Sequence, residues 1–209
     1  LLIDSGADVN AVNSKGLTPV LQAAGFGKLA ILELFAKNKG NFLVKDKEGN
    51  TALHWAIEGA LTKYNEIMHI PFYTGYTLTQ EMVQFLLKKK IDVNAKNKKG
   101  QSALMLGVRG EFDQPEIAKI LIANKADVKL KDKNNDTALM FALGNPKTVT
   151  VLLDSKIDPA IQNNEGKTAL AIAERLACYL GSNNQDLVQS AQLIRAVMGN
   201  KTPRKTLHE

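Results

Sequence analysis

The sequence predicts an all-α protein in which short helix-turn-helix units are stacked into a solenoid. One segment recurs five times: a turn-forming residue, a free position, Thr or Ser, Pro or Ala, and then an aliphatic residue. The copies begin at Gly16, Gly49, Gly100, Asn135 and Gly166, so they are 33, 51, 35 and 31 residues apart. Self-similarity at a period of this size is typical of solenoids, in which each repeat packs only against its neighbours.

Each copy has the composition of a tight turn followed by a helix start. Glycine suits a turn residue with positive φ, and Asn135 is the next-best residue for that conformation. A hydroxyl two residues later is placed to accept a backbone N–H at the helix N-terminus, and the five are Thr18, Thr51, Ser102, Thr137 and Thr168. Pro19 falls at a first helical position, where its missing N–H does no harm.

The apolar periodicity predicts five helix pairs in order. We expect them over 18–25 and 28–37, 51–60 and 79–90, 102–110 and 115–124, 137–143 and 146–155, and 168–180 and 186–198. In the second of these helices we expect a buried stripe made by Leu29, Ile31, Leu32, Leu34 and Phe35. In the fourth we expect Val83, Leu86 and Leu87 to point inward.

The two ends of the array differ from its middle. Residues 1–12 have the pattern of an incomplete repeat, and because Leu1 is not Met we interpret the chain as a fragment of a longer protein. The last helix combines an apolar face with a polar one, as a terminal capping repeat requires. We therefore expect a repeat domain over 1–199, with a partial first repeat, four further repeats and a C-terminal cap, and a flexible tail over 200–209.

These features resemble the ankyrin-repeat family from Leu1 to about Met198. The resemblance is carried by the turns, by Thr51-Ala-Leu-His54, which matches the family's Thr-Pro-Leu-His, and by Gly6-Ala-Asp-Val-Asn10. The family implies that the His54 imidazole forms hydrogen bonds within and between repeat turns. Other copies depart from the pattern, since only the first keeps Pro and only the second keeps His.

The long spacing between Gly49 and Gly100 places an insertion at residues 61–78. It contains four aromatic residues, Tyr64, Phe72, Tyr73 and Tyr76. Pro71 and Gly75 predict that this segment is a loop and not a continuous helix. Two interpretations stay open: the aromatic side chains pack against neighbouring helices, or they present a recognition surface, as long loops in compact arrays often do.

The charge of the chain favours acidic partners only weakly. Its formal net charge is +6 and its pI is near 9.3. Six lysines lie within 88–99, namely Lys88, Lys89, Lys90, Lys96, Lys98 and Lys99, against the single acid Asp92. We favour the interpretation that these lysines are solvated over one in which they form a docking patch. A nucleic-acid-binding protein would be expected to carry basic residues along its whole binding groove, with aromatic residues between them.

No catalytic or cofactor-binding pattern is visible. The sequence has no Gly-rich phosphate loop, nucleophile elbow or His-Glu-x-x-His helix, and no histidine has partners at metal-ligand spacing. We therefore expect a non-catalytic protein without metal or cofactor. We expect the single cysteine, Cys178, to be a small residue of the core. One cysteine permits no internal disulfide, which fits a reducing compartment, and no leader or membrane-length apolar run is visible. An intracellular location is therefore favoured, while the loss of a targeting signal with the part before Leu1 stays open.

The family resemblance implies a non-catalytic scaffold that binds another protein. Contacts are expected from the turn fingertips, the first-helix face that lines the concave side and the aromatic insertion. These residues are Ser14, Lys15, Leu17, Phe26, Lys47, Glu48, Asn50, Glu58, Tyr64, Phe72, Tyr73, Tyr76, Lys98, Lys99, Gln101, Arg109, Lys133, Asn134, Asp136, Asn164, Glu165 and Lys167. We expect a monomer with a protein partner of acidic character and no small-molecule substrate.

Two alternatives remain at this level. In the first, the Lys88–Lys99 cluster binds an anionic surface or a nucleic acid. Nucleic acid is the less favoured of these ligands, because the cluster is confined to one part of the chain. In the second, the repeat array is the targeting module of a larger enzyme or effector.

Overall fold

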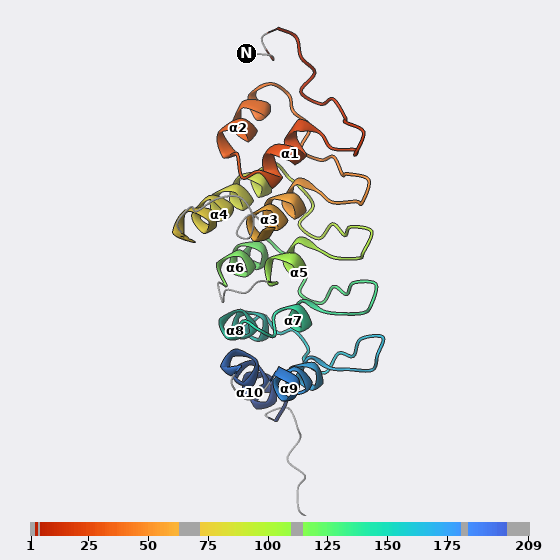
Figure 1. The fold of residues 1–209 in the computed structure, drawn as a ribbon, viewed down its shortest axis with the longest axis vertical. Coiled ribbons are helices and arrows are strands. Elements are labelled where there is room, and N and C mark those ends of the chain that lie inside the picture. Colours follow the sequence, from red (N-terminus) through yellow and green to blue (C-terminus); the bar gives the residue numbers. More distant parts are fainter. Residues whose placement is uncertain (1–2, 4, 63–71, 110–114, 181–183, 200–209) are drawn as a thin grey trace, which may run out of the picture. The chain divides into compact units, whose positions relative to one another are not determined.

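A computed structural model describes residues 3, 5–62, 72–109, 115–180 and 184–199. This part of the chain contains ten α-helices and, besides two isolated bridges, no strand pairing, which confirms the all-α class (Figure 1). The helices are α1 (Pro19–Gly25), α2 (Leu29–Lys37), α3 (Ala52–Thr62), α4 (Phe72–Lys88), α5 (Ala103–Gly107), α6 (Glu116–Ala123), α7 (Ala138–Phe141), α8 (Pro146–Asp154), α9 (Ala169–Leu180) and α10 (Gln185–Gly199).

The chain divides into two compact units. The first comprises Leu1–Gly107 and Glu116–Asp127, and the second comprises Val108–Pro115 and Val128–Glu209. In the first unit, α1, α3 and α5 form one column and α2, α4 and α6 form the other (Figure 1). In the second unit, α7 and α9 lie beside α8 and α10.

The core of each unit is a set of thin layers of small and aliphatic side chains. The largest fully buried ones include Leu21, Leu53 and Leu86 in the first unit and Leu139 and Leu152 in the second. Val83 and Leu86 are completely buried, as predicted, and Leu87 is half-buried. The expected buried stripe of α2 is only partly correct: Leu32 is buried, Leu29, Leu34 and Phe35 are half-buried, and the prediction for Ile31 is wrong because its side chain is 42% exposed. The helices that α2 mainly contacts are α1 and α4.

The helix starts follow the predicted chemistry at most positions. The hydroxyls of Thr18, Ser102 and Thr168 accept backbone N–H groups three residues ahead, at 3.2–3.4 Å. Thr51 instead pairs with His54, and Thr137 makes no side-chain cap. At Thr137 the backbone carbonyl alone receives the N–H groups of Met140 and Phe141.

Every fingertip turn is built by the same two backbone requirements. The predicted left-handed residues have φ values of 71° to 79° at Gly16, Gly49, Gly100 and Gly166 and 61° at Asn135. Three residues before each of them stands an Asn or Asp whose Oδ1 accepts the N–H groups two and four residues ahead, at 2.8–3.1 Å. These residues are Asn13, Asp46, Asn97, Asp132 and Asn163.

His54 joins two repeats of the first unit. The Thr51 N–H donates to its Nδ1 at 3.2 Å, so Nε2 carries the proton and donates to the Gln101 carbonyl at 3.0 Å. This confirms the expected role of the histidine. Burial lowers the pKa of His54 and Lys45 adds to this effect, whereas the bond to Gln101 and the charge of Asp46 oppose it.

The first and third helices approach closely at two glycines. A Cβ added at Gly59 would lie 1.9 Å from the carbonyl oxygen of Gly25, and one added at Gly25 would meet the Trp55 ring at 2.9 Å. Only glycine therefore permits this spacing of α1 and α3. Neither position follows from the turn pattern of the repeats.

The insertion differs from its prediction. Residues 72–78 are helical and begin the seventeen-residue helix α4, and α3 continues to Thr62. A glycine inside a helix costs only about 1 kcal/mol relative to alanine, so Gly75 does not prevent helix formation. Residues 63–71, including Tyr64, lie outside the described residues, as do the side chains of Phe72, Tyr73 and Tyr76 and the predicted tail at 200–209.

Cys178 is a second correction, because its side chain is exposed and does not belong to the core. The buried face of α9 is marked by Ala169 and Ala173. At 100° per residue, position 178 lies on the side of the helix opposite Ala169.

We predict that Gly59→Ala destabilises the protein by about 2 kcal/mol, because the new methyl group must displace a backbone carbonyl. Gly144→Ala is the matched control, since a Cβ there meets nothing within 4 Å. Urea unfolding of both variants provides the measurement. Equal stability of the two variants would show that α1 and α3 tolerate a wider spacing.

We predict that the stability contributed by His54 depends on pH. The folded pKa is lowered, so this stability is present above the unfolded pKa of about 6.5 and is lost as the pH falls through the folded pKa. The difference in unfolding free energy between wild type and His54→Gln should therefore shrink as the pH is lowered from about 7.5 to about 5. A constant difference across this range would contradict the assignment, and the other two histidines cancel because both proteins contain them.

We predict that a thiol reagent labels Cys178 in the native protein nearly as fast as in the unfolded chain, because accessible thiolates react without unfolding. Absorbance after addition of a chromogenic disulfide follows the reaction, with Cys178→Ser as the blank. Slow native labelling that accelerates on unfolding would restore the core assignment.

Candidate functional site

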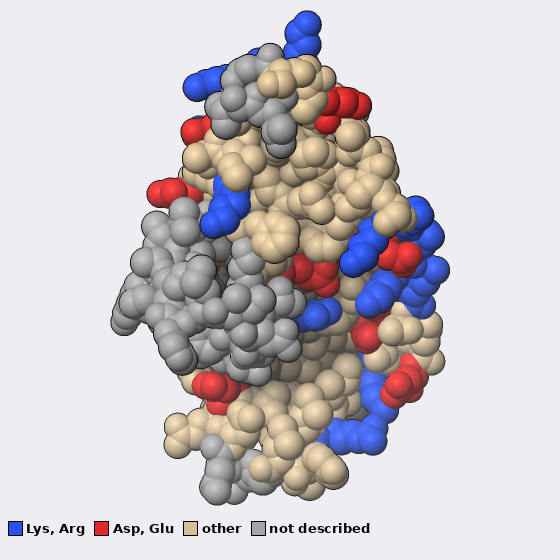
Figure 2. Space-filling model, turned by 45° about the horizontal axis from the view of Figure 1, so that its top comes forward, with Lys and Arg blue, Asp and Glu red and all other residues tan. Residues whose placement is uncertain are grey.

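The residues predicted to contact a partner fall into three groups by exposure. Exposed are Ser14, Lys15, Phe26, Lys47, Glu48, Lys98, Lys99, Arg109, Lys133, Asn134, Asn164 and Glu165; half-buried are Leu17, Asn50, Glu58, Asp136 and Lys167. Gln101 is a correction, because it is only 9% exposed and its backbone binds His54 and Asn97. Figure 2 shows basic and acidic side chains close to one another on the face that it presents.

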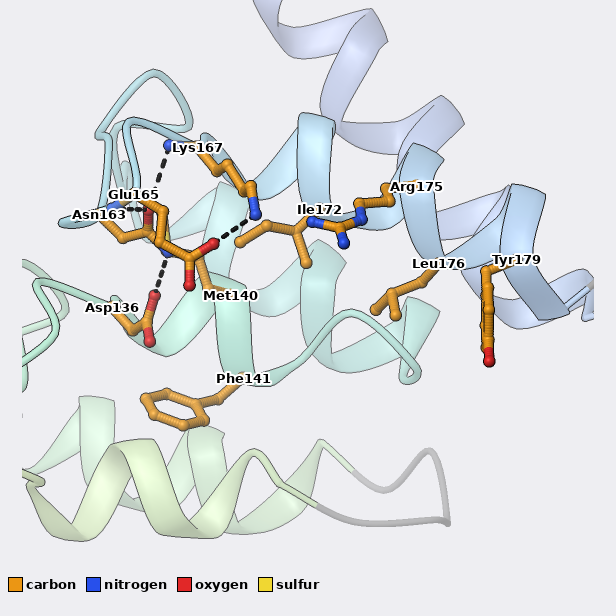
Figure 3. Close-up of a pocket in the computed structure, with 10 residues that line it drawn as sticks. All are labelled: Asp136, Met140, Phe141, Asn163, Glu165, Lys167, Ile172, Arg175, Leu176 and Tyr179. Atoms are coloured by element: carbon orange, nitrogen blue, oxygen red, sulfur yellow. Dashed lines mark hydrogen bonds and ion pairs between the residues drawn. The ribbon is translucent and has the colours of Figure 1, made fainter.

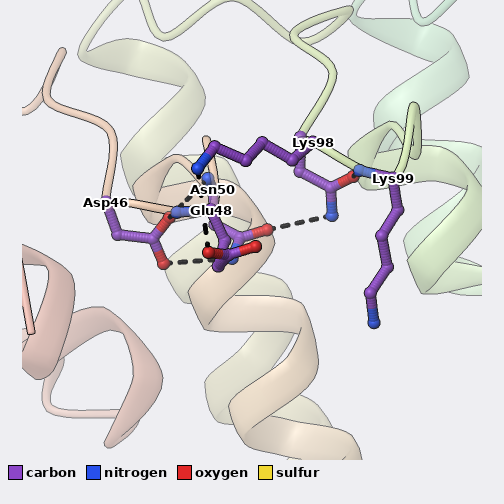
Figure 4. A network of polar contacts seen from close by, with 6 residues as sticks. Asp46, Glu48, Asn50, Lys98 and Lys99 are labelled. Carbon is purple, nitrogen blue, oxygen red and sulfur yellow. Dashed lines mark hydrogen bonds and ion pairs between the residues drawn. The ribbon is translucent and has the colours of Figure 1, made fainter.

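In the first unit, several of these residues are used to hold neighbouring turns together. The carboxylate of Asp46 orders its own turn by accepting the N–H groups of Glu48 and Asn50 and the Trp55 indole N–H. Between neighbouring turns, the Asn97 amide donates to the Asn50 Oδ1 at 3.0 Å. The Lys98 N–H donates to the Glu48 carbonyl at 2.7 Å, and its ammonium lies 3.9 Å from the Glu48 carboxylate. Figure 4 shows this network, with the Lys99 side chain pointing away from it.

The basic cluster within 88–99 is divided by the fold. The Lys89 ammonium lies 4.8 Å from the centre of the Phe85 ring and 5.6 Å from that of Phe42, so it covers aromatic surface. Lys98 faces Glu48. The predicted cluster is therefore split between the end of α4 and the following turn, with part of its charge engaged inside the fold.

The second unit holds a hollow of about 420 Å³ between its turns and its first helices. Figure 3 shows its lining, in which the turns contribute polar groups and the helices contribute mostly apolar ones. The lining residues are Asp136, Asn163, Glu165 and Lys167 from the turns, Met140 and Phe141 from α7, and Ile172, Arg175, Leu176 and Tyr179 from α9.

The polar rim of the hollow is pre-ordered by internal contacts. The Asn163 amide donates to the Asp136 carboxylate at 2.8 Å. The Lys167 ammonium pairs with the Glu165 carboxylate, and this hydrogen bond lowers the pKa of Glu165. Thus three predicted contact residues, Asp136, Glu165 and Lys167, meet at one rim, and their charges already have partners there.

The floor of the hollow differs from the rim in two ways. It is apolar and open to solvent: Tyr179 is 86% exposed and Leu176 is 38% exposed. It also carries the cation Arg175, which has no ion pair or hydrogen bond to any residue that the structure describes, although its charge contributes a small part to the lowered pKa of Glu165. Figure 3 shows the Arg175 side chain extending along α9 toward Ile172.

Residues of this floor were missed by the sequence analysis, although a signal was present. Ile172, Leu176 and Tyr179 follow helical spacing, as does a second apolar face that contains Ala169 and Ala173. A helix that needs only one buried face but carries two apolar stripes indicates an extra contact surface.

Two further properties concern the described residues alone. None of their helices is both long enough and apolar enough to pass through a bilayer. They contain no cluster of three or more His, Cys, Asp or Glu side chains suited to hold a metal ion.

A comparison with protein families agrees with the architecture described above. The model for ankyrin repeats (3 copies) matches residues 1–76, 63–132 and 108–190. These segments contain the fingertip turns and the helix pairs from α1 to the start of α10. Ankyrin repeats are generally protein–protein interaction modules. The chain belongs to the ankyrin-repeat family.

Proposed function

We propose that this chain is a protein-binding scaffold that holds a partner segment in the hollow of its second unit. The observation that carries the proposal is the pairing of an exposed apolar floor, at Leu176 and Tyr179, with the unpaired Arg175. The turn residues Asp136, Glu165 and Lys167 supply a polar rim around it.

The composition of the floor suits recognition of a protein. Tyrosine and arginine are the side chains that most often dominate binding energy at protein interfaces. Tyrosine also provides a large contact area at low entropy cost. Exposed apolar surface framed by polar residues marks interaction sites in soluble proteins. The rim and floor together therefore have the arrangement of a small interface with a central anchor.

The free guanidinium defines the partner's chemistry. Asp136 and Glu165 on the rim already accept bonds from Asn163 and Lys167. Arg175, in contrast, donates no hydrogen bond to any described residue. A carboxylate that pairs with arginine in two parallel bonds satisfies it with geometric specificity. We therefore propose a partner segment in which an acidic residue stands next to an aromatic or large aliphatic one.

The aromatic residues Tyr64, Phe72, Tyr73 and Tyr76 remain a second proposed contact region. Because residues 72–78 begin α4, removing the whole insertion would also shorten a helix that packs against α3 and α6. Single substitutions of these aromatic residues therefore test their role more cleanly than excision.

We predict that peptides selected from a random displayed library by the wild-type chain carry an acidic residue beside an apolar one. Arg175→Glu should weaken binding of the selected peptides by roughly tenfold or more, because it removes the anchor and repels the carboxylate. Fluorescence anisotropy with labelled peptides gives the dissociation constants.

Lys156→Glu is the matched control, since it makes the same charge change at an exposed position outside the hollow. Arg175→Lys separates charge from shape, because lysine cannot form the paired bonds of a guanidinium. The proposal is wrong if the selected peptides lack acidic residues, or if Arg175→Glu and Lys156→Glu weaken binding equally.

A further inference from the structure

Lysines occupy a strained backbone conformation at one repeated position. Among the described residues, Lys39, Lys90, Lys125 and Lys156 have φ values of 61°, 61°, 68° and 61°. Each stands two residues after the end of an outer helix, which is α2, α4, α6 or α8. Gly6 precedes the Ala-Asp-Val-Asn sequence at the corresponding place, with φ 87°. Glycine adopts this conformation freely and lysine rarely does.

An interaction with the helix dipole does not account for two of these lysines, Lys39 and Lys90. A cation near a helix C-terminus interacts favourably with the helix dipole. In α2 and α4, however, the last turn already contains Lys37 and Lys88, whereas the last turns of α6 and α8 contain no basic residue. Lys39 and Lys90 are thus not needed for that purpose, and glycine would satisfy their turns with less strain. Strained residues of this kind concentrate at functional surfaces.

In the first unit these residues form a lysine row, defined as Lys39, Lys90 and Lys125. The helices that precede them lie side by side, α2 against α4 and α4 against α6 (Figure 1). The Asn10 side chain holds the first loop by donating to the Lys39 carbonyl and accepting the Asn41 N–H. Asn94 holds the loop of Lys125 in the same way, through the Lys125 carbonyl and the Asp127 N–H.

The charges of the row are available to a ligand. The side chains of Lys39, Lys90 and Lys125 are exposed, as are those of Lys37 and Lys88, and none has an ion pair within the described part of the chain. The loops also contain two acids, Asp92 and Asp127. The Asp92 carboxylate accepts the Asn94 N–H of its own turn. Five lysines against two acids leave a local charge of +3.

We propose that the lysine row binds an extended acidic segment of a partner protein. Packed helices lie about 8–10 Å apart, which sets the spacing along the row. A peptide in the extended polyproline II conformation advances about 3.1 Å per residue with three residues per turn, so every third side chain faces the same side at a spacing of about 9 Å. The row therefore fits a segment with carboxylates at every third position. This surface is distinct from the hollow of the second unit and does not depend on it.

The test compares two labelled peptides of about twelve residues, a length that spans the row in extended form. One carries Glu at every third position among Ser and Gly, and the other has the same composition with its Glu residues contiguous. Fluorescence anisotropy measures binding to the full chain at about 50 mM salt, where exposed charges are weakly screened. The spaced peptide is expected to bind more tightly than the contiguous one.

The decisive variant is the triple substitution Lys39→Asn, Lys90→Asn and Lys125→Asn, because asparagine tolerates the left-handed conformation. It should weaken binding of the spaced peptide about tenfold, from the loss of three exposed charge pairs. The control Lys15→Asn, Lys28→Asn and Lys99→Asn removes the same charge elsewhere in the first unit and should have less than about a twofold effect. Circular dichroism establishes that both variants fold.

Three results would overturn the proposal. The first is no binding of the spaced peptide, and the second is equal weakening by the two triple variants. The third is tighter binding of a single-stranded oligonucleotide with the same dependence on the row, which would assign the surface to phosphates.

Discussion

The structure depends on one side-chain oxygen in each fingertip turn. An Asn or Asp at the first position accepts two backbone N–H groups of the turn, and a left-handed Gly or Asn three residues later reverses the chain. Buried or crowded backbone N–H groups need such partners, and these side chains provide them within hydrogen-bonding range of their own turn. Because the device recurs at Asn13, Asp46, Asn97, Asp132 and Asn163, each turn has the same shape.

Identical turns allow direct contacts between neighbours within each unit. In the first unit the Lys98 N–H reaches the Glu48 carbonyl, and in the second the Asn164 N–H reaches the Asn134 carbonyl. His54 adds a buried link between the helix start of one repeat and the turn of the next. Backbone contacts and His54 thus join neighbouring repeats. Most exposed side chains at the tips of the turns are not needed for the core and are available for binding. Function in such a scaffold is determined by those side chains and not by the fold.

The sequence predicted the parts of the fold that arise from local chemistry. Helix starts follow from hydroxyl and proline positions, and left-handed turns follow from Gly and Asn135. It failed where tertiary packing decides: the start of α4 lies at Phe72 despite Gly75, and Cys178 is exposed because alanines already fill the buried face of α9. The glycine contact between α1 and α3 depends on the spacing of two helices, which no single repeat specifies.

The candidate site was only partly predictable for the same reason. Asp136, Glu165 and Lys167 were named because they stand at turn positions, but their meeting at one rim follows from the stacking of two repeats. The importance of Arg175 follows from charge pairing in space, since it depends on which acids are already engaged. The left-handed lysines likewise escape a pattern search that expects glycine or asparagine at such places.

The most direct test of the central claim is to map where a selected peptide binds, by following backbone amide chemical shifts of the isotope-labelled chain during titration. The account predicts that the largest changes fall on the lining of the hollow, within 136–141 and 163–179. Changes confined to the outer helices α8 and α10, or to the first unit, would contradict it.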